Sequence, residues 1–291
     1  MAVTSSTENW LPKLVVAPGF VLGFAFIYGF MIWTGVLSLS ASRMLPNYEF
    51  VGLEQYLRLF AMERWWLAMS NLAIFGLLYV GGALALGLGL AILLDQKIRG
   101  EGALRTIYLY PMALSFVVTG TAWKWILDPS LGLQKLMQDL GWSSFRFEWL
   151  GDTDLAIYCV VIAGLWQSAG FAMALFLAGL RGIDDGIIKA AQMDGASLPR
   201  IYWRIILPAL RPVVFSCLLV LSHLAIKSFD LVMALTAGGP GYSTDLPATF
   251  MYSVSFTRGQ LGLGAASATM MLMTLAALVV PYLYSELRRR P

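Results

Sequence analysis

The sequence predicts an all-α membrane protein with six transmembrane helices and a helix-turn-helix loop on the cytoplasmic side. Composition is the first observation: 58% of the 291 residues are hydrophobic and 13% are charged, whereas a typical soluble domain has about 25% charged residues. The second observation is a series of long apolar runs, each near the roughly 20 residues that cross a bilayer as a helix. The third is a charged stretch, residues 184–208, that lies between two of these runs.

The apolar runs define six expected spans in one transmembrane domain, residues 1–291. They are residues 14–39, 67–94, 106–123, 155–180, 209–237 and 260–285. The first run, residues 14–42, has 29 uncharged residues. A cleaved signal peptide has an apolar core of only about 7–15 residues, so we expect a retained span. Cys159 and Cys217 both lie inside apolar runs, and two cysteines in a chain of this length do not indicate a disulfide framework.

Lysine and arginine are distributed unevenly between the two sides of the expected membrane. With the N-terminus inside, the cytoplasmic segments hold 12 of the 20 basic residues, at residues 13, 97–105, 181–211 and 288–290. An excess of Lys and Arg marks the cytoplasmic side of a membrane protein. We therefore expect a multi-pass protein with both termini in the cytoplasm and with residues 184–208 on the same side.

Residues 184–208 have the pattern of two short helices that meet at a bend. Asp184 or Asp185 is a suitable N-cap, because its carboxylate accepts hydrogen bonds from the free N–H groups of the first turn. Gly195 stands where a left-handed residue would end the first helix. Ser197 is placed to cap the second helix, which Pro208 would interrupt. Taken alone, these residues fit an ordinary cytoplasmic loop as well as a docking element.

A motif inside this loop favours a docking element. Its residues are Ala190, Ala191, Asp194, Gly195, Ala196, Ile205, Leu207 and Pro208. The pattern resembles the EAA signature of the permease subunits of bacterial ATP-binding-cassette importers. The resemblance implies a type I importer fold in which the loop docks on a cytoplasmic ATPase subunit through Lys189, Ala190, Ala191, Asp194, Gly195, Ala196, Leu207 and Pro208. Lys189 departs from the motif, which has Glu there, so a salt bridge made by that Glu would need a different partner here.

Further stretches resemble the carbohydrate, maltose-type branch of the same family. They are LTAGGPGYST at residues 235–244, the preceding Phe229 and Asp230, and residues 10–20 and 51–60. The resemblance implies a subunit that forms half of a sugar pathway in the bacterial inner membrane. It also implies the partners: a cytoplasmic ATPase dimer, a second permease in a heterodimer, a periplasmic or extracellular solute-binding protein, the sugar and the lipid bilayer, with no nucleic acid.

The chain lacks a phosphate-binding loop of the type G-x-x-x-x-G-K-[ST], and it has no Gly-Lys pair at all. Energy must then come from another polypeptide, and we expect ATP and Mg to be bound by partner subunits. No paired carboxylates, metal-ligand cluster or activated nucleophile occurs in the expected spans. The chain is therefore expected to be a transport subunit without a catalytic residue, cofactor or metal of its own.

Ionisable residues inside a span are costly, and their default interpretation is functional. Lys227 and Asp230 interrupt the fifth span three residues apart, on one helix face. They either neutralise each other or line the passage with Ser228 and bind sugar hydroxyls. The resemblance adds the middle of the fourth span to this expected pathway, namely Trp166, Gln167, Gly170 and Phe171. His223, one turn before Lys227, joins the set, and we favour packing over proton transfer for it.

Two other functions remain open from the sequence. The chain could be an importer permease of the same superfamily for a non-sugar solute, such as a polyamine, phosphate or an amino acid. It could also be a secondary transporter or a non-transport membrane scaffold, although secondary transporters have inverted repeats and several intramembrane ionisable residues. Neither feature is apparent in this sequence.

Overall fold

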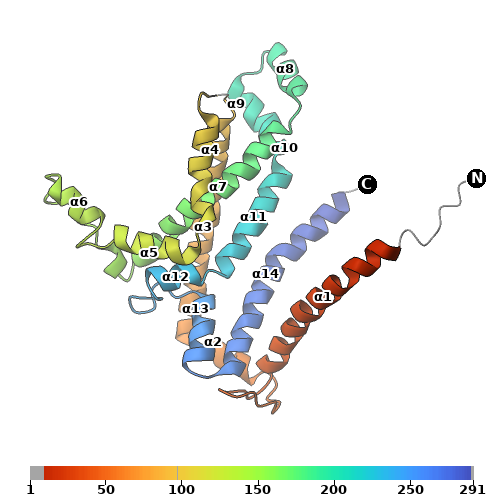
Figure 1. The fold of residues 1–291 in the computed structure, drawn as a ribbon, viewed down its shortest axis with the longest axis vertical. Helices are drawn as coiled ribbons and strands as arrows, with labels where there is room; N and C mark the ends of the chain where they lie inside the picture. Colours follow the sequence, from red (N-terminus) through yellow and green to blue (C-terminus); the bar gives the residue numbers. More distant parts are fainter. Residues whose placement is uncertain (1–9, 97, 290–291) are drawn as a thin grey trace, which may run out of the picture. The chain divides into compact units, whose positions relative to one another are not determined.

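The computed structural model describes residues 10–96 and 98–289, and their regular structure is helical apart from one antiparallel bridge between Ser40 and Phe50 (Figure 1). Lys97 and Arg290, two basic residues of the expected cytoplasmic segments, lie outside the described residues. The α-helices are α1 (Trp10–Ser38), α2 (Glu54–Ala61), α3 (Glu63–Leu94), α4 (Glu101–Leu109), α5 (Phe116–Ile126), α6 (Leu133–Asp139), α7 (Ala156–Arg181), α8 (Asp185–Met193), α9 (Leu198–Ile201), α10 (Leu207–Ala209), α11 (Arg211–Ile226), α12 (Asp230–Leu235), α13 (Pro247–Tyr252) and α14 (Leu261–Arg289).

Within the described residues, four helices are long and apolar enough to cross a membrane. They are Lys13–Ser38 of α1, Glu63–Leu94, Ala156–Arg181 and Leu261–Pro281 of α14. A fifth candidate is the pair Leu198–Ala209 and Arg211–Ile226, which is bent by 62°. The prediction of an all-α membrane protein is confirmed at this level. The third and fifth expected spans, residues 106–123 and 209–237, do not form single straight helices.

The third expected span is broken by its own sequence. After α4 ends at Leu109, a 3-10 turn that contains Pro111 occupies Tyr110–Ala113, and α5 begins at Phe116. Proline has no N–H group for a helical hydrogen bond. Ser115 then caps α5, because its hydroxyl oxygen accepts a hydrogen bond from Val118 N at 3.3 Å. The break therefore has a local cause, and two shorter helices replace one span.

The fifth expected span is broken without such a signal. α11 ends at Ile226, and α12 begins at Asp230. No Gly or Pro occurs at residues 227–229, although these residue types are the usual local breakers of a helix. Packing of α12 against another element, rather than the local sequence, must then hold the break.

The first compact unit comprises the described residues up to Ala61 together with Met251–Met270. In it the segment after α1 is fixed by polar contacts with α2 and the start of α14. Gln55 Nε2 donates to Ser40 O at 3.0 Å, and Gly262 N donates to Ser42 O at 2.8 Å. Gly262 lies so close to this segment that an added Cβ would come 2.5 Å from Ser40 O. Only glycine fits there.

The second compact unit comprises Met62–Phe250 and the described residues from Met271 onward. Its core is the contact of α3 with α7, and α11 packs against both helices. An added Cβ on Gly87 of α3 would overlap Ala172 of α7, and one on Gly164 of α7 would come 3.0 Å from the Tyr79 ring. Small residues let membrane helices approach closely, so these glycines set the distance between the two long helices.

Between α5 and α7 the chain leaves this helical core and forms α6 (Figure 1). A turn ahead of α6 is built on Asp128, whose Oδ1 accepts hydrogen bonds from Ser130 Oγ at 2.6 Å and Ser130 N at 2.8 Å. These hydrogen bonds stabilise the charged carboxylate and lower the pKa of Asp128. The turn lies outside the candidate spans.

Candidate functional site

The second unit contains a cavity of about 480 Å³ at the point where the two broken helices meet the core. Its walls come from the break before α5, from the middle of α7, from α11 and from the first residue of α12. The lining residues are Met112, Leu114, Ser115, Phe116, Gln167, Ser168, Phe171, Val220, Leu224 and Asp230. The cavity thus brings together Gln167, Phe171 and Asp230, which the sequence analysis placed on two different spans.

α5 and α12 each contribute a residue to the cavity lining, Phe116 and Asp230. The two helices lie side by side (Figure 1). A Cβ on Gly120 of α5 would come 2.7 Å from Ala234 Cβ and 3.0 Å from Leu231 O of α12. Because no larger side chain fits at Gly120, the two short helices pack backbone against backbone. This packing is the tertiary contact that holds the break before α12.

Gln167 is a buried polar residue in the cavity wall. Only 4% of it is exposed, and its Nε2 donates to Leu114 O at 2.7 Å across the break in the third expected span. Its Oε1 is buried and has no hydrogen-bond partner among the described residues. A buried polar atom without a partner costs free energy, so a hydrogen-bond donor that reached Oε1 would stabilise this wall.

Asp230 is the first residue of α12 and reaches the same cavity. Its carboxylate does not cap the helix, and it forms no ion pair with a described residue. The neutral Lys227–Asp230 pair, one of the two interpretations of the sequence, is therefore not formed in the described structure. The chain turns out of helical geometry between the two residues, so the three-residue spacing no longer aligns them.

The other predicted pathway residues do not line this cavity. Trp166 packs its ring edge-on against Trp123, with ring centroids 6.1 Å apart. Gly170 lies where an added Cβ would overlap Tyr108 O, so it serves the contact of α7 with α4. His223 and Lys227 have exposed side chains, and Ser228 is half-buried. Their role in a pathway stays a prediction.

The loop of residues 184–208 has the expected local structure. Asp184 caps α8 by accepting a hydrogen bond from Gly186 N at 2.7 Å, and Gly195 has φ +75°. Ser197 precedes α9 as expected, although its side chain makes no capping hydrogen bond. A π-helical turn, Tyr202–Ile206, follows α9 and leads into α10, which contains Pro208. The two-helix prediction is confirmed, with Asp184 as the N-cap and Gly195 in the left-handed turn as expected, whereas Ser197 makes no capping hydrogen bond and Pro208 lies within a helical turn instead of interrupting the second helix.

This loop, which we call the hairpin, has one packed face and one uncovered face. Ile188, Ala191, Ala196 and Ile205 pack against the core of the second unit. On the other face, large apolar side chains are exposed, at Ile187, Met193, Leu198 and Trp203. Of the predicted docking residues, Lys189, Ala190, Asp194 and Gly195 are exposed, whereas Ala191, Ala196, Leu207 and Pro208 are half-buried. Lys189 forms no ion pair with a described residue.

The hairpin is joined to one end of the long helices (Figure 1). Gln96, which follows α3, donates from Nε2 to the Tyr202 hydroxyl at 3.3 Å. At the same end, Arg181 of α7 pairs with Glu101 of α4 at 2.6 Å and lies 3.7 Å from Asp95. These contacts tie the hairpin and three helix ends into one body.

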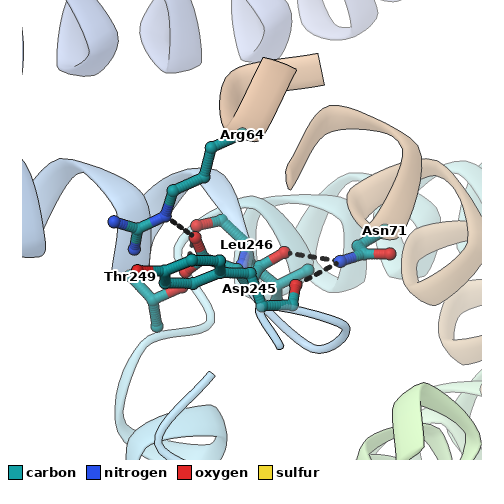
Figure 2. A network of polar contacts seen from close by, with 6 residues as sticks. Arg64, Asn71, Asp245, Leu246 and Thr249 are labelled. Atoms are coloured by element: carbon teal, nitrogen blue, oxygen red, sulfur yellow. Dashed lines mark hydrogen bonds and ion pairs between the residues drawn. The ribbon is translucent and has the colours of Figure 1, made fainter. Parts of the chain in front are cut away.

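A buried polar network lies at the opposite end of α3 (Figure 2). Arg64 Nε and Asp245 Oδ2 are 2.7 Å apart, and the Arg64 guanidinium lies over the Tyr242 ring at 4.0 Å. Asn71 Nδ2 donates to Asp245 O at 3.0 Å, and Thr249 Oγ1 donates to Asp245 Oδ1 at 2.6 Å. The network anchors the loop after α12, which includes the LTAGGPGYST stretch.

Sequence reasoning missed the residues at the break before α5. Ser115 and Phe116 line the cavity, and Leu114 holds Gln167. The sequence does contain a pattern that predicts this break: Pro111 is a helix breaker, and Ser115, four residues later, is a suitable N-cap. Asp245 was missed as well, and no local pattern points to its partner Arg64, which lies 181 residues away.

Over residues 83–290 the chain matches the family described as binding-protein-dependent transport system inner membrane component. The chain belongs to this family. The permease is 41% identical, over 93% of its length and 94% of the relative's, to a probable ABC transporter permease protein of Pyrococcus horikoshii. It is 30% identical to the trehalose/maltose transport system permease protein MalF of Thermococcus litoralis, over 95% of this chain and 93% of that relative.

A solved structure has the same fold as the permease. It is the crystal structure of a bacterial ABC transporter involved in the import of the acidic polysaccharide alginate, with a TM-score of 0.83 and 21% identity. The match covers 98% of both chains. The resemblance to importer permeases seen in the sequence is thus confirmed, and the permease is a transport subunit of a multi-pass inner-membrane complex, not an enzyme.

Proposed function

We propose that the permease forms half of the membrane pathway of a carbohydrate importer, with the cavity at Gln167 and Asp230 as part of that pathway. The observation that carries this proposal is that the second unit contains both the cavity and the hairpin. The cavity presents hydrogen-bond acceptors beside apolar side chains, and the hairpin at the end of the same helices presents an uncovered apolar face. Sugars have both hydroxyl groups and apolar C–H faces, which suit such a cavity.

The hairpin docks on a cytoplasmic ATPase dimer, which binds ATP and Mg and drives transport. Met193 and Trp203 are 90% and 74% exposed, and large exposed apolar patches mark interaction sites. Contacts of the hairpin with Gln96 and with the core of the second unit let its displacement reach the cavity walls, because packed elements move between discrete arrangements. Lys189 takes a partner on the ATPase other than the one that a Glu would take.

The permease crosses the membrane six times and has both termini in the cytoplasm. The four candidate spans supply four crossings, α11 with α12 supplies a fifth, and α4 with α5 supplies the remaining one as a broken span. Broken membrane helices are tolerated where they line a cavity, and the cavity lies at this break. A second permease completes the pathway as a heterodimer, and a solute-binding protein delivers the sugar from the side opposite the hairpin.

The decisive experiment changes Gly195, whose φ of +75° is strained for most side chains. Gly195→Val should abolish sugar uptake by the complete transporter and leave the amount of permease in the membrane unchanged. Gly195→Asn is the matched control, since Asn tolerates the left-handed region, and it should keep most of the uptake. Normal uptake by the Val variant would contradict the assignment of the hairpin as the coupling element.

A further inference from the structure

We propose that the cavity selects uncharged or cationic sugars and rejects sugars that carry a carboxylate or a phosphate, with Asp230 as the specificity-determining residue. This inference rests on the proposed function, because it takes the cavity to be part of the sugar pathway. It specifies the chemical class of substrate, which membership of the family leaves open.

Hydrogen-bond capacity in the cavity wall is weighted toward acceptors. Gln167 donates from its Nε2 to Leu114 O, and its Oε1 has no partner among the described residues. The Asp230 carboxylate can only accept hydrogen bonds. Ser168 Oγ lies 2.6 Å from the Tyr79 hydroxyl, and Ser115 Oγ accepts from Val118 N at 3.3 Å, so the hydroxyl protons of these two serines are donors among the lining side chains. The carboxylate and the amide oxygen favour a ligand that donates, as a sugar hydroxyl or an ammonium group does. A carboxylate or a phosphate dianion has no proton to offer.

The charge of the cavity wall also disfavours an anionic ligand. Asp230 is the one charged residue among the ten that line the cavity, and no Lys, Arg or His is among them. Lys227 lies outside the lining and forms no ion pair with a described residue. An anionic ligand would therefore meet a like charge with no cation of this chain in the wall to offset it.

The remaining lining residues supply apolar contact instead of counter-charges. Phe116 and Phe171 offer aromatic faces, and Met112, Val220 and Leu224 offer aliphatic surface. Apolar C–H faces of a sugar ring pack on such side chains, whereas a solvated anion loses hydration there without compensation. The names of relatives cover solutes of both kinds, since one relative is named for trehalose and maltose, which are uncharged, and another for sn-glycerol-3-phosphate, which is anionic.

The test compares glucose, glucosamine and glucuronate, which share one ring and differ in charge. The assembled transporter without its solute-binding protein, in lipid nanodiscs, is titrated with each sugar by saturation-transfer NMR. We expect the wild type to bind glucose and glucosamine and to bind glucuronate at least about tenfold more weakly, which corresponds to about 1.4 kcal/mol. Asp230→Asn should bring glucuronate to within about threefold of glucose, because the amide adds a donor and removes the charge.

Asp139→Asn on α6 is the matched control, because it removes a carboxylate from a helix that contributes no residue to the cavity lining and should leave the ratio unchanged. An unchanged ratio in Asp230→Asn would overturn the inference, as would equal binding of glucuronate and glucose by the wild type. Failure of the wild type to bind any of the three sugars would also overturn it. If uptake still depends on Gly195 in those cases, only the selectivity has failed and the proposed function stands.

Discussion

Asp245 forms an ion pair with Arg64 and thereby joins two segments that are distant in the sequence. Asp245 has 2% of its side chain exposed and Arg64 13%, and the two atoms that pair belong to segments 181 residues apart. Asp245→Asn should destabilise the permease by about 3–5 kcal/mol, because it removes the charged partner of a largely buried guanidinium. The shift in the unfolding midpoint of the purified complex measures this loss.

A second ion pair of nearly the same length serves as the control for this prediction. Lys135 Nζ and Asp139 Oδ1 are 2.6 Å apart, but more than half of each side chain is exposed. Exposed pairs contribute about 0–1 kcal/mol, so Asp139→Asn should leave the midpoint nearly unchanged. Equal midpoints for the two variants would show that the network of Figure 2 does not stabilise the fold.

At the scale of elements, the contact of α3 with α7 depends on glycines at particular positions. A Cβ on Gly87 would overlap Ala172, whereas a Cβ on Gly89 of the same helix would have no atom within 4 Å. Gly87→Ala should lower stability by about 1–3 kcal/mol, the usual cost of overpacking. Gly89→Ala should be neutral, and thermal unfolding of the two variants side by side gives the comparison. A stable Gly87→Ala protein would mean that α3 can shift along α7.

The uncovered face of the hairpin leads to a prediction about assembly. Trp203→Ala removes the largest exposed apolar side chain of that face, and buried Trp anchors often dominate an interface. It should weaken binding of the ATPase subunits to the permease at least about tenfold, or about 1.4 kcal/mol, in a pull-down titration. Trp142→Ala removes an exposed Trp of another segment and should not change binding. If both variants bind alike, docking does not use Trp203.

Local structure of the hairpin was readable from the sequence because its causes are local. Asp184 and Gly195 each act through their own neighbouring backbone, as an N-cap and as a left-handed residue. The breaks in the third and fifth spans differ in this respect. Pro111 and Ser115 mark the first break in the sequence. The second break is held by the contact of α12 with Gly120. A contact between distant segments leaves no periodic pattern in the sequence.

The cavity was predictable only in part. Gln167, Phe171 and Asp230 were expected because of their chemistry and the family resemblance. Trp166 and Gly170 share the same stretch of α7 as Gln167, yet they pack against Trp123 and Tyr108. A helix turns by about 100° per residue, so neighbours in sequence face different surroundings. The sequence does not say which face the tertiary structure will cover.

At the scale of the whole molecule, the import assignment requires the hairpin and α6 to face opposite sides of the membrane. Both native cysteines are fully buried, so an introduced cysteine reports its own position with little background. Met193→Cys on α8 and Leu140→Cys after α6 replace side chains that are 90% and 73% exposed. In vesicles that hold the permease without its ATPase subunits, an impermeant maleimide should label Met193→Cys only in inverted vesicles and Leu140→Cys only in right-side-out vesicles. The reverse pattern would place the hairpin on the side of the solute-binding protein, where no nucleotide-driven motor could reach it, and import driven through Gly195 would then be untenable.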